Sequence, residues 1–270
     1  MKRIAGFLKY PVLVLVLFIS TATVQAQPST TAVDHKGDGD GCPPYMLRVG
    51  PICFDQYEAS VWSKPPRSDG RPRGVQYGVD GSDYPCSFDG NDCSGQNPIF
   101  AASVPAKIPA SVITWFQAQQ ACANVGKRLP TNAEWQMAAA GTPDVGDDGV
   151  TTCNTDDLAP GLTPTGSRKS CVSNWGAYDM VGNVLEWVAD WFEGSTDPFA
   201  PSDGTSGENF GDDFMVGVNP AVNHGPGTNF PAALVRGGRY NGGTGAGVFA
   251  LNAHFAPSFA ADGGGFRCVR

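Results

Sequence analysis

Residues 178–187 read YDMVGNVLEW, and two further stretches stand out beside them: GKRLPTNAEW at 126–135 and GFRC at 265–268. In the first stretch, Gly182 permits a tight turn, because glycine adopts backbone conformations that are closed to other residues. In the second, Thr131 and Glu134 have the spacing of a capping box at a helix start. The three stretches lie within residues 126–268, and the length of the chain suits one large domain, which is predicted over residues 42–270.

Two helices are predicted from capping boxes that precede apolar residues at helical spacing. Thr114 and Gln117 start the first, and Gly126 ends it, since glycine is favoured just past a helix C-terminus. Pro130 separates the helices, and Gly141 ends the second. We expect both to be scaffold elements. Their buried faces are predicted to contain Phe116, Ala118, Ala121, Cys122 and Val125 in the first, and Trp135, Ala138 and Ala139 in the second.

The remaining elements are predicted to be short strands between loops. Alternating apolar and polar residues predict a first hairpin over 46–61, and residues 233–236 and 266–270 read as core strands. A turn followed by a strand or short helix is expected over 179–191. The chain has 35 glycines and 22 prolines, so turns and loops must be abundant. They include an irregular insertion over 63–106.

The N-terminus reads as an export signal. Three basic residues precede or border an apolar run over 11–19, which is too short to cross a bilayer comfortably. Residues 24–26 (VQA) fit a small-residue cleavage site. Residues 1–26 are therefore predicted to be a cleaved signal peptide, with an uncleaved anchor as the alternative. Residues 27–41 are predicted to be a disordered linker. We expect a secreted or periplasmic protein that has no membrane contact after cleavage.

The charge balance restricts the class of partner. The formal net charge is −8, and the predicted signal carries only basic charges, so its removal would leave a more acidic protein. An acidic protein repels nucleic-acid phosphates. We therefore expect no nucleic-acid partner, and we expect a monomer that binds a protein or a small molecule of unknown identity.

Eight cysteines in an exported chain are expected to form disulfides. Three pairs are suggested by local spacing, because each pair brackets a turn-rich segment: Cys42 with Cys53, Cys86 with Cys93, and Cys153 with Cys171.

The three motifs resemble those of the formylglycine-generating enzyme (sulfatase-modifying factor) family, in the family's order. The resemblance implies an α+β, C-type-lectin-like fold that is rich in loops and has two helices with short antiparallel strands. It also implies that the two remaining cysteines, Cys122 on the first helix and Cys268 at the C-terminus, are joined.

The resemblance further implies a structural calcium site. Calcium prefers carboxylate and carbonyl oxygens. The matching positions offer the side chains of Asp179 and Glu186 and the backbone carbonyls of Gly182 and Val184. From the spacing alone, Asp179 and Glu186 are better explained as turn caps or as partners of an arginine, and it is the resemblance that favours calcium. A second acidic cluster is better read as a solvated loop, with Asn154 a weak candidate ligand. Its members are Asp144, Asp147, Asp148, Asn154, Asp156 and Asp157.

This chain lacks the metal-ligating residues that the oxidase chemistry of the resembled family requires. Formylglycine formation uses two thiolates that bind Cu(I), a soft ion that selects sulfur. Those thiols would lie over 236–265, a segment without cysteine. Related sulfoxide synthases hold non-haem iron with three histidines. This chain has only His35, His224 and His254, without the paired spacing of such a site. We expect neither copper nor iron.

The C-terminal segment has the features of a recognition surface. Its glycine- and proline-containing framework alternates with chemically varied residues, a texture that resembles the variable proteins of diversity-generating retroelements. Each varied residue can be reached from an AAC codon by changing adenines. Aromatic side chains among glycines suit ligand recognition, although the two phenylalanines are equally explained as core. The candidate ligand-binding residues are Tyr240, Asn241, His254, Phe255, Phe259 and Asp262.

The sequence thus favours an exported, non-catalytic ligand-binding protein with a calcium-stabilised, disulfide-linked domain. The alternative is an oxidoreductase of the resembled family that acts on a protein cysteine, or a related non-haem metal enzyme.

Overall fold

The computed structural model describes residues 41–144, 152–156, 161–192, 209–210, 213–216 and 232–270. These residues belong to one compact unit, which begins at His35. The predicted signal peptide lies outside the described residues, as does the predicted linker except for its last residue. Within the described part of the chain, no helix is long and apolar enough to span a bilayer.

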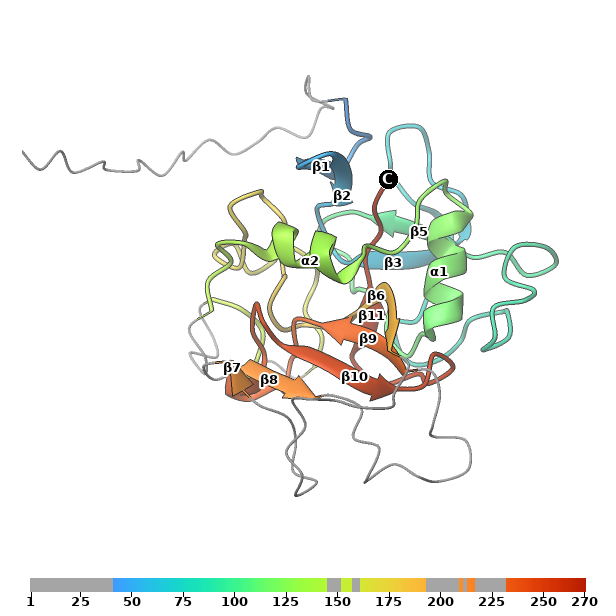
Figure 1. Ribbon diagram of the computed structural model, residues 1–270. Coiled ribbons are helices and arrows are strands. Elements are labelled where there is room, and N and C mark those ends of the chain that lie inside the picture. Colours follow the sequence, from blue (N-terminus) through green and yellow to red (C-terminus); the bar gives the residue numbers. More distant parts are fainter. Residues whose placement is uncertain (1–40, 145–151, 157–160, 193–208, 211–212, 217–231) are drawn as a thin grey trace, which may run out of the picture. The chain divides into compact units, whose positions relative to one another are not determined.

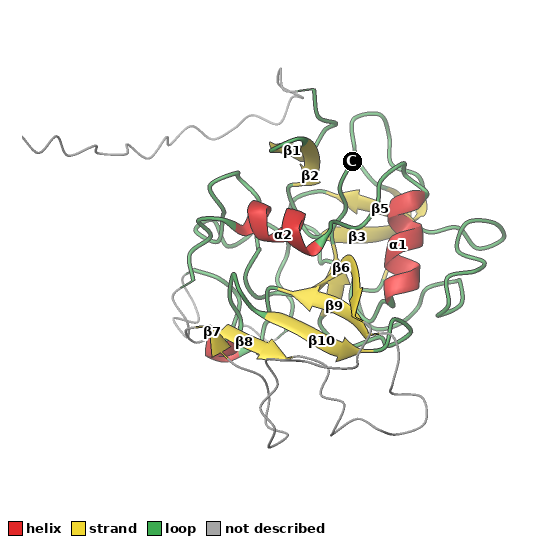
Figure 2. Cartoon of the chain, in the orientation of Figure 1, coloured by secondary structure: helices red, strands yellow, loops and turns green. Residues whose placement is uncertain are grey.

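Both predicted helices are present (Figure 2), and each starts with the expected capping box. Helix α1 extends over Trp115–Ala123 and helix α2 over Asn132–Ala139. The α1 face that turns inward differs from the prediction: Phe116 and Val125 are only partly buried. Gln117 is buried instead, and its amide donates a hydrogen bond to the Cys86 carbonyl (3.1 Å). Gly126 and Gly141 follow the two helix ends with positive φ, as a helix stop requires.

The described strands form three sheets (Figure 1). The first hairpin pairs β1 with β2 only, because β3 joins a separate sheet in the order β4–β3–β5. The prediction of one hairpin over 46–61 was therefore wrong in its second half, and the region predicted to be irregular contains β4 and β5. The bounds are Met46–Val49 for β1, Ile52–Asp55 for β2, Ala59–Lys64 for β3, Arg73–Tyr77 for β4 and Phe100–Ser103 for β5.

The largest sheet has six strands in the order β11–β6–β9–β10–β8–β7. Most pairs are antiparallel, but β11 pairs parallel with β6 and β10 parallel with β8. The predicted strand at 266–270 is instead centred on 264–266, while Val269 forms isolated bridges to Phe54 and Arg128. The bounds are Leu185–Phe192 for β6, Asn209–Phe210 for β7, Asp213–Val216 for β8, Ala232–Arg236 for β9, Leu251–Phe255 for β10 and Gly264–Phe266 for β11, with a 3₁₀ turn η1 at Gly243–Gly245.

The core lies between the helices and the central strands. Helix α1 packs on β5 and β6, and α2 packs on β1, β6 and β9. The apolar side chains form two main buried clusters, one under each helix, centred on Trp187 and Trp135 respectively. Four disulfides join Cys42 to Cys53, Cys86 to Cys93, Cys122 to Cys268 and Cys153 to Cys171, so all eight cysteines are paired.

The α2 capping box includes an ion pair that makes stability depend on pH. Two guanidinium nitrogens of Arg128 donate to the Glu134 carboxylate (2.7 and 2.6 Å). Hydrogen bonds from Arg128, then from the Thr131 backbone, lower the pKa of Glu134 to about 2. Because the folded pKa lies below the unfolded one, this stabilisation is present above about pH 4.3 and is lost as the pH falls toward 2.

We therefore expect Glu134→Gln to lower the free energy of unfolding by only about 0.5–1 kcal/mol at neutral pH, since the Arg128 side chain is 45% exposed and solvent screens the pair. The difference from wild type should shrink as the pH is lowered toward 2, as measured by urea unfolding across that range. Asp69→Asn, at an exposed residue, is the control. A difference that grows toward low pH would contradict this assignment.

Candidate functional site

A tight turn at residues 179–183 places the central motif against the loop at Asn154. Asp179, Gly182 and Asn183 all have positive φ, at 57°, 74° and 58°. Asp and Asn tolerate this conformation better than most residues. At Gly182 no side chain fits, because an added Cβ would lie 2.1 Å from the Asn154 carbonyl oxygen. The Asn183 N–H donates to that same oxygen (2.8 Å). The turn and the Asn154 loop are therefore held together by backbone contact.

A buried ion pair lies beside this turn. Arg267 donates from Nη2 to Glu186 Oε1 (2.5 Å) and from Nε to Oε2 (2.7 Å). The Trp135 indole donates to Oε2 as well (2.6 Å). These three residues come from the C-terminal motif, the central motif and α2, and all are buried. The three sequence motifs thus meet at one buried carboxylate.

Glu58 belongs to the same group of charges and was missed in the sequence. Its carboxylate accepts hydrogen bonds from the Asn183 amide (2.6 Å) and from the Val184 N–H (3.1 Å). No sequence spacing singled it out, since Asp55 and Gln56 lie just before it in the same stretch. Burial, followed by the neighbouring carboxylates Asp179 and Glu186, raises the pKa of Glu58 well above its usual value.

Asp179 also lies inside the protein, where its Oδ2 accepts a hydrogen bond from the Gly166 N–H (2.7 Å). Burial raises the pKa of Asp179 to about 6, against the lowering effect of the Gly166 hydrogen bond and of Arg267. The cluster of Glu58, Asp179, Glu186 and Arg267 therefore contains three buried carboxyl groups around one buried guanidinium. Fully ionised, it would carry more negative than positive charge.

Two features of this region concern the predicted calcium site. Both oxygens of Glu186 accept hydrogen bonds from Arg267. This contact is the pairing with an arginine that the residues suggested as an alternative to calcium binding. Nearby, the buried side-chain oxygen Asn154 Oδ1 has no hydrogen-bond partner among the described residues, and a buried polar atom of this kind calls for an unseen partner. The donor set at the turn is of the oxygen type that calcium prefers. The calcium site stays a prediction.

The second acidic cluster is only partly described. Asp147, Asp148 and Asp157 lie outside the described residues. Asp144 accepts a hydrogen bond from the Val248 N–H (2.9 Å).

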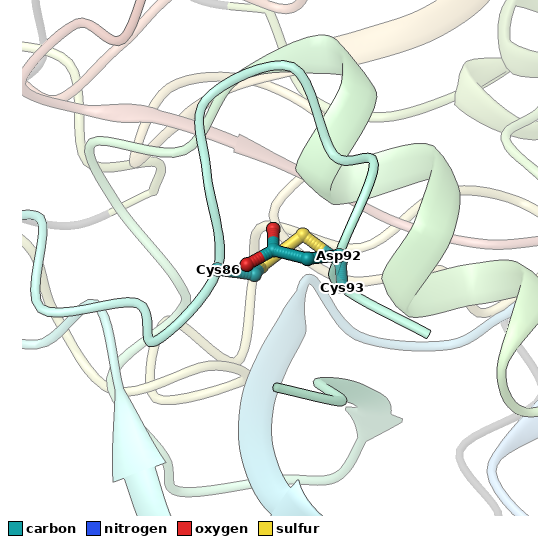
Figure 3. A group of neighbouring side chains, drawn as sticks. All are labelled: Cys86, Asp92 and Cys93. Carbon is teal, nitrogen blue, oxygen red and sulfur yellow. A yellow bond between two sulfur atoms is a disulfide. The ribbon is translucent and has the colours of Figure 1, made fainter. Parts of the chain in front are cut away.

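One compact group of potential metal-ligating residues occurs in the described part of the chain, formed by Cys86, Asp92 and Cys93. Figure 3 shows the two sulfur atoms bonded to each other. A disulfide offers no thiolate, so this group is not a metal centre of the thiolate type. Asp92 accepts hydrogen bonds from the Ser87 backbone (2.7 Å) and side chain, which lower its pKa to about 2. The group therefore fixes a disulfide-closed turn.

Two of the candidate ligand-binding residues meet at a cavity. The Tyr240 hydroxyl donates to Asp262 Oδ2 (3.0 Å), and both residues line a cavity of about 580 Å³. Asn241 is exposed beside Tyr240. Tyr240 is also fixed through its backbone, because its N–H donates to the Asn183 carbonyl (3.0 Å) in the motif turn. The candidate surface is thus attached directly to the motif turn at residues 179–183.

Phe255 and Phe259 form a separate pair, in which one ring contacts the core and the other is partly exposed to solvent. Their rings stack with centroids 5.0 Å apart. Phe255 packs edge-to-face on the buried Trp187 (6.3 Å between centroids), whereas Phe259 is 44% exposed. Phe255 therefore anchors the pair and Phe259 presents it to solvent. The side chain of His254 lies outside what the structure describes, as do His35 and His224.

Comparison with known proteins identifies the family of this domain. The sulfatase-modifying factor enzyme 1-like domain matches residues 43–270. The chain is 36% identical over 92 residues to the serine/threonine-protein kinase Pkn1 of Chlamydia trachomatis, a match to 32% of this chain and 14% of that protein. It is 32% identical over 135 residues to the formylglycine-generating enzyme of Thermomonospora curvata, a match to 40% of this chain and 45% of that enzyme.

The chain therefore spans less than half the length of these curated relatives. Among solved structures, the I1 variant of the Major Tropism Determinant is similar, with a TM-score of 0.46, 17% identity, and coverage of 84% of this chain and 52% of that one. The matched domain includes both helices and all three motifs. The chain belongs to the sulfatase-modifying factor enzyme 1-like domain family, and its two helices with small sheets agree with the C-type-lectin-like fold expected from the resemblance.

Proposed function

We propose that this protein is an exported, non-catalytic ligand-binding member of the family, with its binding surface in the C-terminal segment. One observation carries the proposal: residues 236–265 contain no cysteine, and every cysteine of the chain is in a disulfide. Cu(I) held by thiolates requires free thiols. This scaffold therefore keeps the family framework without the groups that would perform the family's oxidation.

The binding surface we propose consists of the pair Tyr240 and Asp262, the neighbouring Asn241 and the pair Phe255 and Phe259, with His254 on the same segment. Support comes from the cavity that Tyr240 and Asp262 line and from the exposure of Asn241 and Phe259. Aromatic side chains with polar partners are typical of recognition surfaces. The partner is a protein or a small molecule, and we further propose that this segment is diversified.

The alternative is an oxidoreductase acting on a protein cysteine, which the similarity to the formylglycine-generating enzyme of Thermomonospora curvata favours. We expect a sulfatase-type cysteine peptide, incubated with the purified protein, copper and oxygen, to be recovered unmodified. Mass spectrometry of the peptide measures the outcome, and an active formylglycine-generating enzyme under the same conditions is the positive control. Stoichiometric conversion of the peptide's cysteine would overturn the non-catalytic proposal.

We also propose that a structural calcium ion stabilises the domain at Asp179, Gly182, Val184 and Glu186, with Asn154 beside it. The excess of buried carboxyl groups over the single guanidinium supports a bound cation, as does the unpartnered Asn154 Oδ1. Such an ion would hold the motif turn and thereby the backbone that carries Tyr240. It would supply no catalytic step.

Calcium at about one hundred times its Kd is expected to stabilise the fold by about 2.7 kcal/mol, which corresponds to a rise in Tm of roughly 5–10 °C for a domain of this size. The comparison is wild type in calcium against wild type in chelator, with magnesium as the ion control. Asp179→Asn should reduce the shift, whereas Asp69→Asn should leave it intact. Equal melting temperatures of the wild type in calcium and in chelator would contradict the site.

Export is the last part of the proposal. Four disulfides are typical of proteins that mature in oxidising compartments. N-terminal sequencing of the protein recovered outside the cytoplasm should begin at Gln27.

A further inference from the structure

The cavity beside Tyr240 and Asp262 has the size and lining of a small-ligand site. Its volume of about 580 Å³ falls within the range of roughly 300–1,000 Å³ found for ligand pockets. Residues from four separate segments form its walls. They are Val79, Asp80 and Gly81 after β4; Ile108, Ser111 and Val112 before α1; Gly161 and Leu162; and Tyr240 and Asp262 of the C-terminal segment.

The charge facing this cavity has one sign. Among its lining residues, all of which the structure describes, Asp80 and Asp262 are the charged ones, and both are exposed. Neither takes part in a salt bridge within the described residues. Two basic residues are sequence neighbours of lining residues. Lys107, next to Ile108, lies over the Trp62 ring (5.6 Å), and Arg239, next to Tyr240, donates to the backbone carbonyl of Asp262 (3.4 Å).

Tyr240 is held in place beside this negative charge. Its hydroxyl bonds Asp262, and its ring lies against the backbone at Gly263, where an added Cβ would be 3.3 Å from the ring. The Gly263 N–H donates to Ser111 Oγ (2.9 Å), which joins the C-terminal segment to the opposite wall. An aromatic ring next to a carboxylate is a typical arrangement for recognising organic cations. Because the Tyr240 ring is already held in position, less conformational entropy is lost when a ligand binds.

The remaining wall is apolar and partly strained. Val79 is 36% exposed, and Ile108, Val112 and Leu162 are partly buried around the opening. Val112 has φ of 52°, which is unusual for a β-branched residue. Such strain persists where the surroundings fix it and is often found at functional sites. These side chains suit a ligand whose charged end is attached to a short apolar stem.

We infer that this cavity binds an organic cation, an ammonium or guanidinium group on an apolar stem, with Asp80 and Asp262 balancing its charge and the Tyr240 ring facing its methylene groups. The inference rests on the proposed ligand-binding function and names the chemical class of its ligand. A free amine and a lysine or arginine side chain of a partner protein share this chemistry.

The test is calorimetric titration of the full-length protein with n-butylammonium, butyrate and 1-butanol, which share a stem and differ in charge. We expect n-butylammonium to bind with Kd in the millimolar range, as its few atoms allow, and to bind more tightly than the other two. Asp262→Asn should weaken it about tenfold, and Tyr240→Leu should also weaken it. Asp69→Asn, outside the cavity, should have no effect. Melting curves establish that each variant is folded, and Tyr240→Phe provides a conservative second variant at that position.

The result also separates the two sources of the cation. Tighter binding of the capped peptide Ac-Gly-Lys-Gly-NH2 than of n-butylammonium assigns the cavity to a side chain of a partner protein, and the reverse order assigns it to a free amine. Equal or tighter binding of butyrate or butanol, absence of n-butylammonium binding, or indifference to Asp262→Asn overturns the inference. The non-catalytic part of the proposed function is judged separately by the peptide oxidation assay, so failure of the cation site and failure of that part can be told apart.

Discussion

Replacing Arg267 by methionine is expected to lower the free energy of unfolding by about 3–5 kcal/mol, the range found when one partner of a buried ion pair is removed. Arg267 is fully buried, and its guanidinium donates to both oxygens of Glu186 and to the Asp55 and Tyr178 carbonyls. Methionine preserves apolar volume but no donor. The variant would leave Glu58, Asp179 and Glu186 together without their cation, and it would leave the two carbonyls unsatisfied.

Urea unfolding at neutral pH, under non-reducing conditions and in chelator, measures this loss. The matched control is Arg71→Met, which removes an exposed partner of Asp69 (70% and 52% exposed side chains). That control should change stability by less than about 1 kcal/mol. If the two variants were equally stable, the Arg267–Glu186 pair would not be the central contact of the three motifs.

Removal of the Cys122–Cys268 disulfide by a double alanine substitution is expected to lower the free energy of unfolding by up to about 5 kcal/mol. The two residues are 146 positions apart in the sequence. In the chain-entropy description, a disulfide restricts the unfolded chain more as the loop it closes becomes longer. This disulfide joins α1 to the C-terminal residues that follow β11, so its loss also frees the segment that carries Arg267.

The Cys86–Cys93 pair provides a matched control, because it closes a separation of only 7 residues and its sulfur atoms are also buried. The same relation gives about 2 kcal/mol for its removal. Both double variants are compared with wild type by urea unfolding. Equal losses would show that chain restriction is not the main contribution of the long-range disulfide.

The local elements of this fold could be predicted from the sequence because their determinants are close in the chain. Thr114 with Gln117 and Thr131 with Glu134 are each three residues apart, and both capping boxes are present. Gly182 was expected to permit a tight turn, and the turn excludes any side chain there. Short-range backbone chemistry of this kind depends little on the rest of the molecule.

The pairing of strands could not be predicted from the sequence, because it depends on segments that are far apart in the chain. The residues after the first hairpin have a strand pattern, yet nothing local indicates that β3 leaves β1 and β2 to pair with β4 and β5. Likewise, the parallel pairing of β11 with β6 shifts the last strand to 264–266. Its position is fixed by the backbone of β6, not by its own apolar residues.

The sequence by itself determined the fold family, the helix starts and the absence of a thiol pair over 236–265. The fold family follows from the resemblance of three motifs to those of a known family, and the other two follow from residue types within short stretches of chain. Only the tertiary structure decided that Glu58 joins Asp179, Glu186 and Arg267, and that Tyr240 and Asp262 line one cavity with Asp80. Glu58 lies 125 positions from Asn183, to which it bonds. The physical reason is that charge balance and cavity shape are properties of side chains that packing brings together from distant segments.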